Sequence, residues 1–194
     1  MINAQHIILI CWGIFLFYWI ISWRKVKRTK KTEVNFTRTP WLLMWIVLLI
    51  GIFFYNPNPS SIFHIFPCQA MWMDCYGIQV LGVIMAISGL MIALVARYTL
   101  DGNWSSNIDI KKEHELKTDG IYSYSRHPIY TGISFLVFGT FLVYQSLGTL
   151  VVFTIVILFF CYKIRREEAL LIEYFPKAYT AYKKRTKALI PFIV

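Results

Sequence analysis

The sequence is poor in acidic residues and contains long stretches with no charge at all. Only 10 Asp and Glu stand against 20 Lys and Arg in 194 residues, and 57% of the residues are hydrophobic. Mean hydropathy is +0.54. Ordinary soluble domains are about 45–50% apolar, so this composition excludes that class. The length leaves room for one compact domain.

Several familiar site signatures are also absent. The sequence has no CxxC pair, no P-loop, no GxGxxG and no internal repeat, and its four histidines are dispersed. Metal ligands normally come in clustered His and Cys residues, so we expect no metal site. Cys68 and Cys75 share a predicted outer loop, and the sequence is compatible with either a disulfide between them or two free thiols.

Charge is missing from four long runs, and these predict the membrane helices. The uncharged runs are 7–23, 39–73, 75–96 and 129–162. About 17–25 apolar residues suffice for a helix to cross the hydrocarbon core. The first run lacks a basic flank and a cleavage site, so we interpret it as a retained helix rather than a signal peptide. "NPNPSS" divides the second run and "YQSLGT" the fourth. We predict five spans, at 5–23, 40–56, 76–97, 128–145 and 148–164.

The basic residues test this count. Seven fall in 24–38, five in 97–126 and eight in 163–187, which accounts for all 20, whereas the other connecting segments have none. The positive-inside rule then predicts an odd number of helices, with the N-terminus outside and the C-terminus in the cytosol. We interpret the charge as a topology signal in a plasma, inner or endoplasmic-reticulum membrane and do not expect nucleic-acid binding. The 24–38 loop is interpreted as a plain basic flank.

The stretch "SRHPIYTG" begins the fourth predicted span. Pro128 suits the first turn of a helix, which places His127 at or next to the N-cap and Arg126 just outside. Free backbone N–H groups, the helix dipole and Arg126 together favour an anion such as a carboxylate. Tyr130 lies in the first turn, where its ring could form a wall of a site. Alternatively, the arginine anchors the helix at the headgroups and the tyrosine belongs to an aromatic belt.

A second polar block follows the last predicted span. Glu167 and Glu168 are adjacent, and Lys163 precedes Glu167 by four residues on the same helical face. Paired acids would suit a ligand with a cation and hydroxyls, although a solvated i,i+4 pair remains the alternative. A carboxylate pocket beside paired acids is compatible with a zwitterion such as S-adenosylmethionine.

Two segments carry a family resemblance. "NWSSNIDIKKEHELKTDGIYSYSRHPIYTG" followed by "REEALLIEYFPKAYTAYKKRTKALIPFI" resembles the isoprenylcysteine carboxyl methyltransferase family and, more distantly, the membrane phospholipid methyltransferases. The match covers roughly residues 100–194. It implies an all-α integral membrane protein of about five transmembrane helices, with a cytosolic S-adenosylmethionine pocket formed by the C-terminal half. Residues 1–75 would hold the first two helices and their loops, and 76–194 the methyltransferase core.

The resemblance also implies site residues, carried over motif by motif. The implied cofactor contacts are Asn107, His114, Glu115, Leu116, Lys117, Tyr122, His127, Pro128, Ile129, Tyr130 and Glu167. Lys163 falls at the position that contacts the substrate. At this position the chain departs from the family, whose members have arginine. Lysine is a point charge and cannot grip a carboxylate with two parallel hydrogen bonds, so the acceptor stays open.

The expected activity is methyl transfer to a lipid-like acceptor that enters from the bilayer. The first hypothesis is methylation of a carboxylate, such as the C-terminal isoprenylcysteine of a prenylated protein, with Arg126 or Lys163 orienting the acceptor. A carboxylate is ionised at pH 7 and needs no general base, so alignment and exclusion of water would supply most of the rate. The alternatives are a phospholipid amine or small thiol as acceptor, a membrane reductase, or a non-catalytic scaffold.

Overall fold

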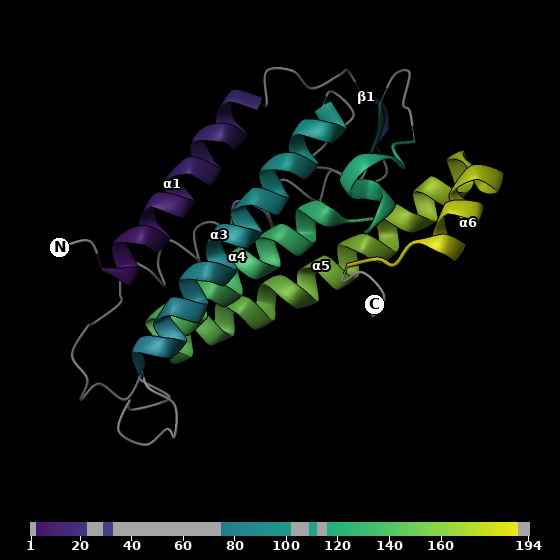
Figure 1. The fold of residues 1–194 in the computed structure, drawn as a ribbon. Coiled ribbons are helices and arrows are strands. Elements are labelled where there is room, and N and C mark those ends of the chain that lie inside the picture. Colours follow the sequence, from purple (N-terminus) through teal and green to yellow (C-terminus); the bar gives the residue numbers. More distant parts are fainter. Residues whose placement is uncertain (1–2, 23–28, 33–74, 102–108, 112–115, 190–194) are drawn as a thin grey trace.

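Helices dominate the architecture. The computed structural model describes residues 3–22, 29–32, 75–101, 109–111 and 116–189. The elements are α1 (Ala4–Ser22), β1 (Thr29–Thr32), α3 (Cys75–Leu100), β2 (Asp109–Lys111), the short 3-10 helix η5 (Gly120–Ser123), α4 (Pro128–Tyr144), α5 (Leu147–Tyr174) and α6 (Pro176–Arg185) (Figure 1).

Four of the five predicted spans coincide with helices. Among the residues that the structure describes, three helices are long and apolar enough to cross a membrane, and α4 is a shorter apolar helix. Helix α5 continues ten residues past the predicted end of its span, to Tyr174. The predicted span at 40–56 and Cys68 lie outside the described residues.

Helices α3 and α4 approach each other backbone to backbone (Figure 1). A Cβ added to Gly89 would lie 2.5 Å from the carbonyl oxygen of Gly132, and one added to Gly132 would lie 2.6 Å from the nitrogen of Ala93. Small residues at helix contacts are typical of membrane bundles, where van der Waals packing drives association. This helix pair therefore forms a closely packed frame for the start of α4.

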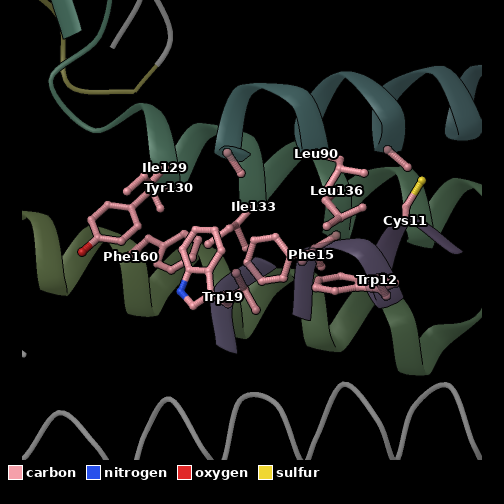
Figure 2. Packing of buried hydrophobic residues seen from close by; sticks show 14 of the residues in the cluster. Cys11, Trp12, Phe15, Trp19, Leu90, Ile129, Tyr130, Ile133, Leu136 and Phe160 are labelled. Carbon is pink, nitrogen blue, oxygen red and sulfur yellow. The ribbon is translucent and has the colours of Figure 1, made fainter. Parts of the chain in front are cut away.

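Helix α1 contributes a buried aromatic face to the same core. Phe15 and Trp19 stack at a centroid distance of 4.3 Å and face Ile133 and Phe160 (Figure 2). The Trp12 indole N–H donates a hydrogen bond of 3.1 Å to Thr140 Oγ1. The outer face of α1 is apolar as well, and helices that are hydrophobic all round are typical of membrane spans.

The C-terminal ends of α1 and α3 lie together at the end of the bundle where α4 begins. Arg97 is buried and donates to the carbonyl oxygens of Ser22 (2.8 Å) and Asp101 (2.7 Å). Tyr122 in η5 donates to the carbonyl oxygen of Ala96 at 3.3 Å. These bonds hold the ends of α1 and α3 together and hold η5 against α3.

The opposite end carries the tight turn predicted between α4 and α5. Gln145 adopts a left-handed conformation (φ 47°), and Ser146 caps α5 by accepting a hydrogen bond from the Thr149 N–H at 3.2 Å. The turn makes α4 and α5 antiparallel, as the sequence predicted, so the start of α4 and the charged part of α5 share one end.

The fold is mostly helical rather than all-α. Strands β1 and β2 pair antiparallel, with Thr32 opposite Asp109 and Thr29 opposite Lys111. Pairing satisfies backbone groups that neither segment can satisfy alone. Residues 29–32, within the segment interpreted as a basic flank, are therefore joined through their backbone to the polar block after α3.

Candidate active site

The site begins at the turn that leads into α4. His127 occupies the N-cap position and Pro128 the first turn, as predicted. The backbone N–H groups of Arg126 and His127 donate to the carbonyl oxygens of Lys187 and Ala188, both at 2.9 Å. The segment after α6 thus runs beside the turn and fixes its backbone.

Arg126 is turned toward α5 and the C-terminal segment. Its Nε and Nη2 lie 2.8 and 2.7 Å from Glu168 Oε1, and it also donates to the carbonyl oxygen of Thr186. The side chain is only 8% exposed. Much of its hydrogen-bonding capacity is used within the protein, and its contact with an acceptor stays a prediction.

Glu168 is a site residue that the sequence did not single out, because the family resemblance implied Glu167 instead. It accepts from Arg126 and, through Oε2, from Lys183 Nζ at 2.7 Å. His127 Nε2 lies 3.5 Å from its Oε1. The adjacency of the two glutamates was the available signal, but the partner on α6 is 15 residues away and could not be inferred from spacing.

Glu167 brings together three of the predicted site residues. Its Oε1 accepts a 2.7 Å hydrogen bond from the Tyr130 hydroxyl and lies 3.6 Å from Lys163 Nζ. Its Oε2 lies 3.7 Å from His127 Nδ1. The carboxylate is 20% exposed, whereas Lys163 is 1% exposed. A single carboxylate therefore joins the start of α4 to the middle of α5.

The aromatic rings form a stack beside this carboxylate. The Tyr130 ring stacks with the His127 ring, at a centroid distance of 5.6 Å and an interplanar angle of 13°, and with the Phe160 ring, at 4.7 Å and 26°. Lys163 Nζ is 5.5 Å from the centre of the Tyr130 ring, within the range of a cation–π contact. Figure 2 shows Tyr130 and Phe160 at one end of the apolar cluster, so the site adjoins the apolar core of the helix bundle directly.

Two buried tyrosines, Tyr122 and Tyr182, pack beside the turn that leads into α4. Tyr182 of α6 donates to the carbonyl oxygen of Tyr122 at 2.5 Å. Burial raises the pKa of Tyr182 to about 12 and raises the pKa of Tyr122 well above its ordinary value. Both hydroxyls therefore remain neutral donors at pH 7. The Tyr122 hydroxyl is directed at Ala96, and its predicted cofactor contact stays a prediction.

The remaining predicted residues are placed less fully. Pro128 and Ile129 are buried at the start of α4, and Leu116 and Lys117 are half-buried before η5. Asn107, His114 and Glu115 lie outside the described residues. Within the part of the chain that is described, no three His, Cys, Asp or Glu side chains gather in a way that could hold a metal ion.

Apolar helices with a cluster of buried charges at one end define a helical integral membrane protein. Residues 81–173 match the model of the isoprenylcysteine carboxyl methyltransferase (ICMT) family. This segment contains α4, most of α3, and α5 as far as Glu173, and so includes both site glutamates. The resemblance expected from the sequence is confirmed.

Individual relatives agree. The chain is 39% identical to the protein-S-isoprenylcysteine O-methyltransferase of Saccharomyces cerevisiae, over 59% of this chain and 49% of that protein. It is 34% identical to the enzyme of that name from Xenopus laevis, over 64% and 43%. The structure of a eukaryotic intramembrane Ras methyltransferase, ICMT, matches with a TM-score of 0.57 and 24% identity over 83% of this chain and 55% of that chain. The chain thus spans about half the length of the curated relatives it matches.

Proposed function

We propose that the protein is an S-adenosylmethionine-dependent methyltransferase of the membrane, which esterifies the carboxylate of a C-terminal isoprenylcysteine or a similar lipid-like acceptor. One observation carries the proposal: His127, Tyr130 and Lys163 converge on the Glu167 carboxylate at 2.7 to 3.7 Å. The names of the relatives support the reaction class.

The chemistry of this cluster fits the cofactor. Glu167 is a partly exposed carboxylate in an otherwise buried setting, able to accept hydrogen bonds from hydroxyls or to face a cation. Glu167, His127 and Tyr130 would hold the cofactor with Tyr122 and the segment from Asn107 to Lys117. When bound, S-adenosylmethionine supplies a methyl group on a sulfonium.

Lys163 would orient the acceptor. It is a buried cation placed one residue after the uncharged run of α5 ends, so it lies where a lipid-anchored carboxylate would meet the protein. The acceptor oxygen would form a bond to the methyl carbon as the carbon–sulfur bond breaks, and the electron pair would leave with the neutral thioether. No proton must be removed from a carboxylate at pH 7.

Arg126 would act as a positioning residue. Through Glu168 it ties the start of α4 to α5, and through Thr186 it ties both to the C-terminal segment. Alignment to within about 1 Å governs displacement reactions, so this frame would matter for turnover without touching the acceptor.

The end of the bundle that holds the site would face the cytosol. Arg97, Arg126 and Lys163 all lie there, and the positive-inside rule places such residues on the cytosolic side. A labelling reagent that cannot cross membranes would react with an engineered cysteine at Lys184 only after permeabilisation.

Methyl transfer from labelled S-adenosylmethionine tests the activity. The purified protein is assayed with N-acetyl-S-farnesylcysteine, with a phospholipid amine and with a small thiol. We expect a base-labile methyl ester from the first acceptor, a turnover strongly reduced in Lys163→Ala, and a smaller loss in Arg126→Ala. Methylated amine or thioether as the sole product would overturn the carboxylate assignment. Unchanged turnover in both variants would exclude a role in methyl transfer for both Lys163 and Arg126.

A further inference from the structure

Two buried hydroxyls near the start of α4 bind the chain that follows α6. The C-terminal segment, residues 186–189, leaves α6 and runs back to the start of α4 (Figure 1). Ser125 Oγ donates to the carbonyl oxygen of Ala188 at 2.9 Å, and Thr131 Oγ1 donates to that of Leu189 at 2.8 Å. Both side chains are buried. Neither hydroxyl has a part in the methyl transfer proposed above.

The C-terminal segment is held through its main chain. The carbonyl oxygens of Lys187 and Ala188 accept from the backbone N–H groups of Arg126 and His127, both at 2.9 Å, and Ser125 pairs with Lys187 in a parallel bridge. On the side of the segment, the acceptors of these bonds are backbone carbonyl oxygens. A buried carbonyl that loses its donor is unfavourable, so removing a hydroxyl should weaken the docking of the segment.

His127 depends on contacts from outside α4. Its backbone is non-helical (φ −127°, ψ 56°), and its side chain makes no capping hydrogen bond. Its N–H donates to Ala188 and also, at 3.3 Å, to Ser125 Oγ, and its carbonyl oxygen accepts from Thr131 Oγ1 at 3.3 Å. The two hydroxyls therefore bracket the turn that sets the imidazole 3.7 Å from Glu167.

We propose that Ser125 and Thr131 are positioning residues for the cofactor: they hold the C-terminal segment in place, and the segment holds the His127 ring where it meets S-adenosylmethionine. The inference rests on the proposed function, because it takes the Glu167 cluster as the cofactor site. If the cofactor binds the docked form, its apparent Kd is the intrinsic Kd divided by the docked fraction. Weaker docking then raises the Kd of the cofactor and leaves the KM of an acceptor at Lys163 unchanged when cofactor is saturating.

Thr140 offers a matched control for loss of stability alone. It is a buried threonine on the same helix, and its Oγ1 accepts from the Trp12 indole at 3.1 Å and donates to the carbonyl oxygen of Leu136 at 2.8 Å. It lies about 13 Å from Thr131 along α4, at 1.5 Å per residue. Thr140→Val therefore removes a hydroxyl from the core of α4 without removing a bond to the C-terminal segment.

Calorimetry with S-adenosylmethionine and thermal unfolding, on the same detergent-purified variants, test the proposal. A net hydrogen bond changes an equilibrium constant roughly two- to tenfold, so we expect Ser125→Ala and Thr131→Val each to raise the Kd at least about threefold. Thr131→Ser keeps the hydroxyl and should retain the wild-type Kd. Thr140→Val should lower the unfolding midpoint with the Kd unchanged. The KM of N-acetyl-S-farnesylcysteine at saturating cofactor should be the same in all variants.

The results distinguish this proposal from the proposed function. If the folded wild-type protein binds no S-adenosylmethionine, the proposed function fails. If the wild type binds it but Ser125→Ala and Thr131→Val keep the same Kd, or Thr140→Val raises the Kd as much as they do, the positioning role is wrong. A rise in the acceptor KM alone would assign the segment to acceptor binding and would also overturn the proposal. Should one variant fail to fold, the other gives the same test, because each hydroxyl binds a different carbonyl.

Discussion

Glu168 provides the sharpest test of how the site is held together. Its carboxylate accepts from Arg126 at 2.8 Å and from Lys183 at 2.7 Å. Glu168→Gln keeps the volume of the side chain but removes the charge that both cations face. Arg126 is 8% exposed, so it would be left as a buried cation with the Thr186 carbonyl as a remaining partner.

The magnitude follows from the burial of the two partners. Breaking a buried ion pair from one side costs about 3–5 kcal/mol. The retained carbonyl contact reduces this, and we expect about 2–4 kcal/mol from Arg126. Lys183 is 46% exposed, so its share is within roughly 1 kcal/mol. For a chain of this size, 1 kcal/mol corresponds to about 2–4 °C in the unfolding midpoint.

The assay is thermal unfolding of the detergent-purified protein, followed by circular dichroism. Glu168→Gln should lower the midpoint by at least about 4 °C, and Lys183→Met, which removes only the exposed partner, should lower it by less. Equal midpoints for the two variants would show that the buried Arg126–Glu168 pair contributes no more to stability than the exposed Lys183–Glu168 pair.

Three further predictions concern the helix packing and the acceptor site. Gly132→Ala should destabilise the protein by about 1–3 kcal/mol, because its Cβ would lie 2.6 Å from the backbone of Ala93. The control Gly13→Ala, whose Cβ would have no atom within 4 Å, should be neutral or stabilising, and equal unfolding midpoints for the two variants would contradict the packing of α3 on α4. Trp12→Phe should cost about 0.6–2 kcal/mol through the lost bond to a hydroxyl on α4, and no loss would show that the bond is not formed. Lys163→Met should lower kcat/KM for a carboxylate acceptor at least about tenfold while Lys163→Arg retains most of it; the same loss in both would exclude a role for the charge.

Four of the spans and the start of α4 could be predicted from the sequence because each rests on a local signal. Uncharged runs mark helices in a membrane, and a proline in the first turn fixes where α4 begins. The turn at Gln145 was equally readable from short polar residues between two apolar runs. The resemblance to a known family then joined His127, Tyr130 and Glu167 into one site.

The partners of Arg126 could not be predicted, because they are set by tertiary packing. Glu168 comes from α5 and Thr186 from the segment after α6, while Lys183 contacts Glu168 from α6, and no spacing rule connects these residues to the turn before α4. The pairing of β1 with β2 was missed for the same reason: residues 29–32 have the composition of a basic flank, and only their backbone is used.

The assignment of the cofactor site depends most directly on binding of S-adenosylmethionine to the purified protein, measured by calorimetry. We expect saturable binding that is lost in His127→Ala and Glu167→Ala and retained in Glu173→Ala, an exposed glutamate on the same helix. No binding to the folded wild-type protein, or binding unchanged in the first two variants, would contradict the assignment of this cluster as the cofactor site.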